Sequence, residues 1–296
     1  LVLRLSFALG YWVGKPLTLD EQEYLLLARS LTEGRGFTYA SPGSAGAPAR
    51  HFDRPPVYPL FVAGLLKLSR PPAVEPDHAG VPVAVKVGQS VLGAFAVWLL
   101  GIIALRAAGA AAGMLSAWIA AVYPPLIWIC AYLLTEALYL PLALAVVWLL
   151  GEVIDRGTPG RRLWLVFAAG LVAGAAVLTR EAMVFFLLIA CAWLLATRRL
   201  RVAALLLAGA LVVLLPWGAR NLDVHGQFVL GAAHGGVNFW IGNNPLARGE
   251  GDMAANADIK QAQIAIEERH RGLTASQIDS VYYREARDYI VRHPAA

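Results

Sequence analysis

Long apolar runs recur along this chain and are separated by short polar connections. The runs are Pro82–Leu105, Ala110–Ile129, Leu133–Leu150, Leu163–Leu178, Ala182–Ala196 and Val202–Trp217. A helix needs roughly 20 apolar residues to cross a bilayer, and several of the runs approach that length. The first run, Leu1–Gly14, is shorter, and we expect it to be the outer end of a truncated helix. The pattern therefore predicts about seven membrane helices.

The composition agrees with a membrane protein. Hydrophobic residues make up 58% of the 296 residues and charged residues 15%, whereas a soluble domain carries about 25% charged residues. Neither the two cysteines, Cys130 and Cys191, nor the six histidines show the spacing of metal ligands. The net charge of +5 is not gathered on a basic, aromatic face, so no nucleic-acid partner is expected. We predict an all-α polytopic membrane protein whose surface contacts membrane lipids.

The basic residues predict which way the chain crosses the membrane. Three alternate short connections carry them: Arg106, then Arg156, Arg161 and Arg162, then Arg198, Arg199 and Arg201. Cytoplasmic loops concentrate Lys and Arg, so these connections are assigned to the cytoplasm. The other connections then face outward. We expect a multi-pass protein of the plasma (inner) membrane.

This assignment gathers polar residues of both signs on the outer side. They are Asp20, Glu21, Arg54, Glu136, Arg180, Glu181, Arg220 and Asn221. Ionisable groups at membrane depth are costly and tend to face a cavity or one another. Helix ends also carry polar residues as a rule, but the whole set favours a site on the extracytoplasmic face.

The outer segments have patterns of their own. Asp20–Thr32 predicts a helix and Tyr58–Leu68 a short interfacial helix. The VNFWI run near residue 240 is interpreted as extended, and Thr274–Val291 as an amphipathic helix that opens with a capping box to Gln277. We divide the chain into a membrane core, 1–217, with an outer catalytic loop, 15–81. An extracytoplasmic loop and juxtamembrane helix, 218–296, follows, and we expect a C-terminal remainder after it.

An ordered set of short motifs resembles a known group of enzymes. The motifs are DEQEY (Asp20–Tyr24), RPPVYPLF (Arg54–Phe61), TEALYL (Thr135–Leu140), LTRE (Leu178–Glu181), PWGARN (Pro216–Asn221) and GGVNFWIGNNP (Gly235–Pro245). Together they resemble the GT-C class of membrane glycosyltransferases that use lipid-linked sugars. The nearest branches are the dolichyl-phosphate-mannose protein mannosyltransferase-like family (family 39) and its bacterial aminoarabinose-transferase relatives. The resemblance covers essentially the whole chain as an N-terminal membrane half. It implies a GT-C-type transmembrane helix bundle with amphipathic helices in the first outer loop.

The resemblance also implies a reaction. A sugar moves from a polyprenyl-phosphate carrier to an acceptor on the outer face, with inversion at the anomeric carbon. A carboxylate then removes the proton of the acceptor hydroxyl, and cations neutralise the departing lipid phosphate. The acceptor (protein, lipid or glycan), the identity of the sugar and the need for a divalent metal ion stay open.

The resemblance implies a role for several residues, and each of these residues also has a simpler structural interpretation. Asp20 matches the aspartate that acts as general base, whereas an acidic residue in a first helical turn also stabilises the helix dipole. Glu21 fits a capping box with Thr18 and is expected to support the site. Tyr24, one turn on, orients Asp20 or packs. Arg54 matches a basic residue that contacts the donor phosphate, or it is an interfacial cation whose stem lies along apolar surface.

At two positions the chain differs from the aminoarabinose branch. Glu23 stands where that branch has an arginine, and His51 where it has a tyrosine. Phosphate contacts are therefore expected from His51, Arg180 or Arg220, although Arg180 is also placed to pair with Glu136 or Glu181. Supporting roles are assigned to Glu136, Glu181, Asn221 and Asn243, the last also being a typical turn residue.

Two other functions compete with transfer. A transporter or flippase of lipid-linked sugars would also gather charges around a cavity, but transporters often show internal repeats and midplane charges. No repeat is evident here, and the charges lie at helix ends. A non-catalytic membrane scaffold is the second alternative.

Overall fold

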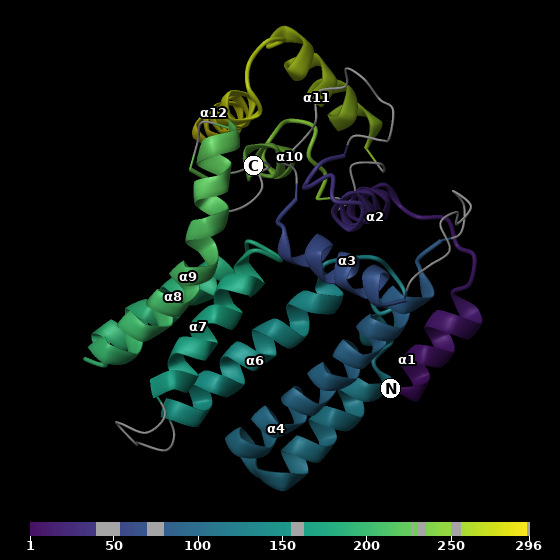
Figure 1. Ribbon diagram of the computed structural model, residues 1–296. Helices are drawn as coiled ribbons and strands as arrows, with labels where there is room; N and C mark the ends of the chain where they lie inside the picture. Colours follow the sequence, from purple (N-terminus) through teal and green to yellow (C-terminus); the bar gives the residue numbers. More distant parts are fainter. Residues whose placement is uncertain are drawn as a thin grey trace. The chain divides into compact units, whose positions relative to one another are not determined.

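The computed structural model describes residues 1–39, 54–69, 80–154, 163–225, 228–229, 235–249 and 256–294. Within these ranges all the regular elements are helices (Figure 1). They are α1 (Val2–Ser6), a π-helix η1 (Phe7–Tyr11), α2 (Leu19–Thr32), α3 (Val57–Ser69), α4 (Val83–Val122), α5 (Pro124–Trp128), α6 (Glu136–Ile154), α7 (Leu163–Val177), α8 (Met183–Ala196), α9 (Leu200–His225), α10 (Gly235–Gly242), α11 (Ala257–Arg269) and α12 (Ala275–Arg292). The chain forms two compact units, Leu1–Gly231 and Ala232–Ala296, which are described separately.

Helix α4 is a helical hairpin. Ala108 and Gly109 leave the helical conformation, and Gly109 has a φ of 86°, which glycine adopts without steric cost. The two arms then fold back on each other. A Cβ on Gly113 would lie 2.9 Å from the carbonyl oxygen of Gly101, so the backbones are in contact. This turn separates the spans predicted at 82–105 and 110–129, although the second arm stops at Val122, before the short helix α5.

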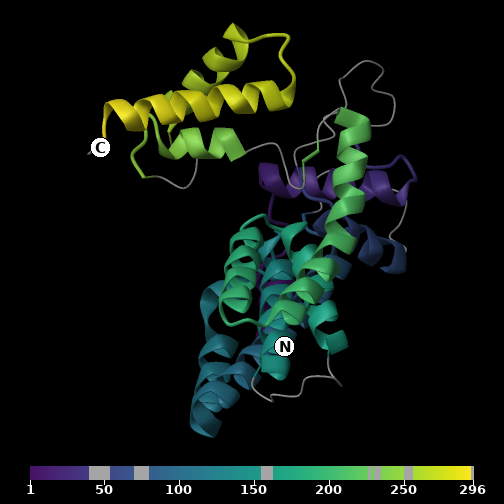
Figure 2. The ribbon, with the colours of Figure 1, turned by 90° about the vertical axis from the view of Figure 1, so that its left-hand side faces the viewer.

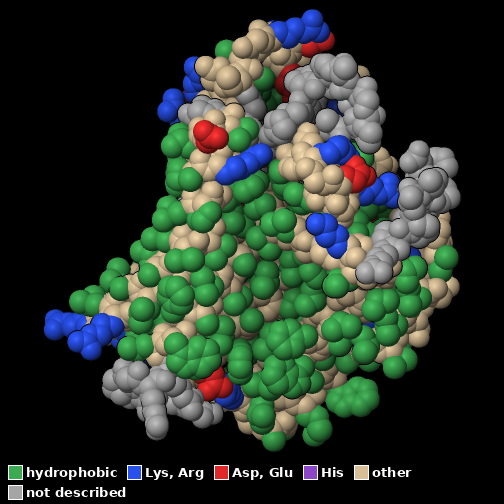
Figure 3. All heavy atoms as spheres, in the orientation of Figure 1, with side chains coloured by type: hydrophobic (Ala, Val, Ile, Leu, Met, Phe, Trp, Pro, Cys, Tyr) green, Lys and Arg blue, Asp and Glu red, His purple; other side chains and the backbone are tan. Residues whose placement is uncertain are grey.

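Several helices of the first unit have the length and apolar composition of membrane-spanning helices. Among the described residues, α4, α6 and α9 are long and apolar enough to span a membrane, while Val2–Tyr11, α3, α7 and α8 are shorter apolar helices. Figure 3 shows hydrophobic side chains covering the sides of these helices. Trp118, Phe185 and Ile189 are each more than half exposed, as is typical of lipid-facing positions. The chain is an all-α polytopic membrane protein, as its sequence predicts.

Small residues bring α7 and α9 together. A Cβ on Gly170 would lie 2.2 Å from the carbonyl oxygen of Leu206, and one on Gly209 would lie 2.3 Å from that of Phe167. Membrane helices that lack a hydrophobic driving force between them associate through such close backbone contact. The pair forms the centre of the largest apolar core, to which α6 and α8 also contribute.

An ion pair marks one end of this bundle. Arg106, just before the α4 turn, pairs with Glu152 near the end of α6. The α4 turn and the end of α6 therefore share one end of the bundle, in agreement with the alternation predicted from the basic loops. The start of α6 and the end of α7 lie at the opposite end (Figure 1).

Helices α2 and α3 pack on each other beside that opposite end. Tyr24 and Ala28 of α2 share a buried cluster with Tyr58 and Val62 of α3, and the rings of Tyr24 and Tyr58 meet edge to face with centroids 4.9 Å apart. Both helices were predicted from the sequence.

Two predictions about the later segments need correction, and one helix was not predicted. The last apolar run was expected to end at Trp217, but α9 continues to His225. In the second unit the VNFWI run is helical in α10, not extended, because Asp279 Oδ1 accepts hydrogen bonds from the Gly236 and Val237 amides at the start of that helix. Helix α11 was not predicted. Helix α12 was, and the predicted capping box is formed; Figure 2 shows α10 and α12 side by side.

Candidate active site

The site begins at the N-terminus of α2. The Thr18 side chain accepts a hydrogen bond from the Glu21 amide at 3.4 Å, and Glu21 Oε2 accepts one from the Thr18 amide at 2.8 Å. This is the predicted capping box, in which two otherwise unpaired amides of the first turn are satisfied reciprocally. It fixes where α2 starts and therefore holds Asp20 in the first turn.

The second oxygen of Glu21 reaches a distant segment. Glu21 Oε1 accepts a hydrogen bond from the Leu133 amide at 2.8 Å, and the residue is 2% exposed. Leu133 lies just before α6. Both carboxylate oxygens of Glu21 are thus bound to backbone amides, so this residue connects the start of α2 to the segment that leads into Glu136.

Two further contacts fix the surrounding segments. The buried Gln89 accepts from the Tyr58 hydroxyl at 2.6 Å and donates to the carbonyl of Tyr132 at 2.7 Å. The Val57 amide donates to the Leu178 carbonyl at 3.1 Å. The first contact connects α3 through α4 to the segment before α6, and the second connects α3 directly to the end of α7.

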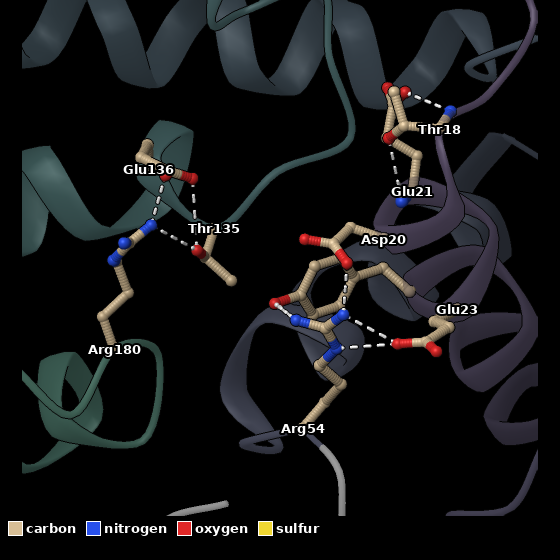
Figure 4. Close-up of polar contacts among 9 residues, drawn as sticks. Thr18, Asp20, Glu21, Glu23, Arg54, Thr135, Glu136 and Arg180 are labelled. Carbon is tan, nitrogen blue, oxygen red and sulfur yellow. Dashed lines mark hydrogen bonds and ion pairs between the residues drawn. The ribbon is translucent and has the colours of Figure 1, made fainter. Parts of the chain in front are cut away.

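Arg54 precedes the Pro55-Pro56 pair, and its side chain lies against α2 (Figure 4). Its Nη2 lies 2.5 Å from Asp20 Oδ1 and 2.7 Å from Glu23 Oε2, and its Nε lies 2.9 Å from the same Glu23 oxygen. Asp20 and Glu23 are three residues apart and therefore share a helix face. One guanidinium thus bridges two carboxylates of a single helix turn.

Tyr24 completes this group. The Arg54 guanidinium carbon lies 4.9 Å from the centre of the Tyr24 ring, and Nη1 donates weakly to the Tyr24 hydroxyl at 3.4 Å. Burial raises the pKa of Tyr24; Arg54 offsets part of this, whereas Asp20 and Glu136 add to it. Burial by itself would lower the pKa of Arg54, but Tyr24, Glu23 and Asp20 raise it above the ordinary value. The tyrosine is therefore neutral and the guanidinium charged.

A second ion pair lies across the site (Figure 4). Arg180, just after α7, pairs with Glu136 at the start of α6, and its Nη1 lies 3.2 Å from the Thr135 hydroxyl. The Thr135 hydroxyl also donates to Glu136 Oε2 at 3.2 Å. The salt bridge that the sequence offered as the simpler role of Arg180 is formed. Both side chains are more than two-fifths exposed, so the pair is open to a ligand.

Residues 53–219, more than half of the chain, match the model of the dolichyl-phosphate-mannose-protein mannosyltransferase family. The chain belongs to this family. It is a membrane glycosyltransferase, in agreement with the resemblance found in its sequence motifs. No curated protein and no solved structure matches the chain significantly.

The family match starts next to the site. It includes Arg54, Glu136 and Arg180, whereas Asp20 and Glu23 precede it. The structure joins the two parts, because Arg54 at the beginning of the matched segment binds both carboxylates of α2. Arg220 and Asn221 follow just after the match ends.

Arg220 and Asn221 lie within α9 and do not mark its end. The Arg220 guanidinium lies 4.8 Å from the Trp217 ring and 5.7 Å from the Phe37 ring, and it donates to Asn221 Oδ1 at 3.0 Å. Asn221 is 2% exposed and donates to the Val229 carbonyl. Arg220 therefore lies inside α9 and contacts the rings of Trp217 and Phe37.

The remaining predicted residues are less informative. Glu181 is exposed, and His51 lies outside the described residues. Asn243 belongs to the second unit, where its side chain donates to the Phe239 carbonyl at 2.8 Å, as expected of a turn residue. Among the described residues no group of three or more His, Cys, Asp or Glu side chains is arranged to hold a metal ion.

Two important residues were missed. Glu23 was noted only for the arginine it replaces, yet its spacing of three residues from Asp20 places both carboxylates on one face of α2. Gln89 lies in an apolar run, and a lone polar residue at membrane depth is itself a signal of a buried contact.

Proposed function

We propose that this glycosyltransferase moves a sugar from a polyprenyl-phosphate donor to an acceptor hydroxyl on the extracytoplasmic face, with inversion at the anomeric carbon. The contact between Asp20 and Arg54 carries the proposal. It brings together the two kinds of group that this chemistry requires, a carboxylate to accept a proton and a guanidinium to bind a phosphate.

Asp20 is proposed as the general base. Its side chain is 54% exposed, so an acceptor hydroxyl can reach it. As the acceptor oxygen bonds to the anomeric carbon, the bond from that carbon to the phosphate oxygen breaks, and the hydroxyl proton passes to the Asp20 carboxylate. Attack opposite the leaving phosphate inverts the anomeric centre.

Arg54 is proposed to bind the donor phosphate and to stabilise the charge that the phosphate gains as it leaves. A guanidinium suits this task because its planar N–H groups match two phosphate oxygens at once. Arg180 is proposed as a second phosphate cation, held by Glu136 and Thr135 until the donor arrives. Glu21 supports both groups by connecting α2 to the segment before α6.

The outer location is supported by the charges at the two ends of the bundle. Arg198 and Arg199 lie between α8 and α9 and Arg201 lies in the first turn of α9, at the end that also contains the Arg106–Glu152 pair. Asp20, Arg54, Glu136 and Arg180 gather at the other end. Because basic loops favour the cytoplasm, the site is assigned to the opposite face.

The test uses the full-length protein in lipid vesicles with labelled polyprenyl-phosphate sugars and candidate acceptors, and the product is identified by mass. Glycosyl transfer should be detected, and Asp20→Asn should slow it by about 10²–10⁴-fold, the usual contribution of a general base. Wild-type rates in Asp20→Asn would refute the assignment of the base. Movement of the intact donor across the membrane without any transfer would support the transporter alternative instead.

A further inference from the structure

The hydrogen bonds of Arg54 leave little room for another ligand. A guanidinium has five N–H groups. The Nε hydrogen and one Nη2 hydrogen point to Glu23 Oε2, at 2.9 and 2.7 Å, and the other Nη2 hydrogen points to Asp20 Oδ1 at 2.5 Å. Nη1 donates to Tyr24 at 3.4 Å. Four of the five N–H groups are therefore in use, and a phosphate that binds the parallel Nη1 and Nη2 groups together has to take the place of Asp20 at Nη2.

The charges oppose such an exchange. Two carboxylates face one guanidinium, so Asp20, Glu23 and Arg54 together carry a net negative charge. The Glu136–Arg180 pair adds no net charge. A phosphate that binds Arg54 is thus repelled by whichever carboxylates remain charged beside it.

We propose that Glu23 is a positioning residue that competes with lipid phosphate for Arg54 and thereby drives release of the polyprenyl-phosphate product. The inference rests on the proposed function. Glu23 holds the Nε and Nη2 edge of Arg54 while the donor phosphate replaces Asp20 at Nη2. After transfer Asp20 carries the acceptor proton and is neutral. Glu23 takes no part in the reaction and keeps its charge, so it is the carboxylate that still repels the phosphate held at Arg54.

The effect discriminates between donor and product because their charges differ. The donor is a phosphodiester with one negative charge, whereas the product is a phosphomonoester with a charge of about −1.5 to −2 at pH 7. Repulsion from Glu23 grows with that charge. The same carboxylate therefore weakens product binding more than donor binding, which favours turnover.

Binding measurements on the full-length protein in detergent test the proposal. The probes are farnesyl phosphate, as a monoester, and its methyl diester. Glu23→Gln should bind the monoester about tenfold and the diester about threefold more tightly than wild type, since removing one nearby charge acts about twice as strongly on a dianion. Glu23→Asp keeps the charge and should stay near wild type. Glu33→Gln is the matched control, because Glu33 pairs with Arg35 beyond the end of the same helix.

The outcomes separate this inference from the proposed function. A merely structural role of Glu23 predicts equal or weaker binding in Glu23→Gln, with no preference for the monoester, and this result would overturn the inference. If Arg54→Ala leaves farnesyl phosphate binding unchanged, the phosphate site itself is wrong. If Arg54→Ala weakens binding while Glu23→Gln matches wild type, only the role of Glu23 falls.

Discussion

Arg54 Nη2 lies 2.5 Å from Asp20 Oδ1, although 34 residues separate the two along the chain. The proposed base is therefore paired with the arginine that is proposed to bind phosphate. A phosphate that takes the place of Asp20 at Nη2 also frees Asp20 to accept a proton. This coupling implies that the donor binds before the acceptor reacts.

Replacing Arg54 by lysine should raise the KM for the donor by about tenfold or more, because an ammonium group cannot present two parallel N–H donors to a phosphate. Initial rates measured over a range of donor concentrations check this. Arg35→Lys makes the same change in an exposed pair with Glu33 and should leave the KM unaltered. An unchanged KM in Arg54→Lys would mean that Arg54 does not bind the donor.

Replacing Glu21 by glutamine should destabilise the protein by about 1–3 kcal/mol, because one of the two amides bound to this buried carboxylate loses its acceptor. The midpoint of thermal unfolding in detergent reports the loss. Glu33→Gln, at the exposed end of the same helix, should change the stability by less than about 0.5 kcal/mol. Equal midpoints for the two variants would contradict the role given to Glu21.

Replacing Gly209 by leucine should prevent α7 and α9 from packing, because even a Cβ would lie 2.3 Å from the Phe167 carbonyl oxygen. We expect little folded protein on size-exclusion chromatography. Gly64→Ala is the control, since nothing lies within 4 Å of a Cβ at that helical position, and alanine favours a helix by about 1 kcal/mol. A well-folded Gly209→Leu protein would refute the close approach of these helices.

The pH dependence of stability should show the raised pKa of the buried Tyr24. Burial raises its pKa in the folded state above the ordinary value of about 10. The folded state therefore resists loss of the proton, so stability is unaffected below pH 10 and falls as the pH rises beyond it. Tyr24→Phe has no proton to lose and should show a smaller fall between pH 9 and pH 11. Identical slopes for the two proteins would argue against a buried Tyr24.

Periodicity predicted most of the helices, since α2, α3, α7, α8 and α12 follow local apolar patterns. It failed where distant groups decide the conformation. Helix α10 owes its first turn to Asp279, some 40 residues later. The partners of Arg54 were likewise not predictable, because the choice between phosphate ligand and ion pair depends on how α3 packs against α2. Glu23 could be identified as a partner of Arg54 only from that packing.

The short helices of the bundle have a consequence for the lipid around the site. Helix α7 has 15 residues and is therefore about 22 Å long, whereas the hydrocarbon core of a bilayer is about 30 Å thick. Local thinning of the membrane is one way in which hydrophobic mismatch of this kind is relieved. The carrier lipid proposed to bind Arg180 is then expected to lie in a thinned patch of the bilayer, with its phosphate below the headgroup plane of the surrounding leaflet. Transfer in vesicles should accordingly be faster in short-chain than in long-chain phospholipids.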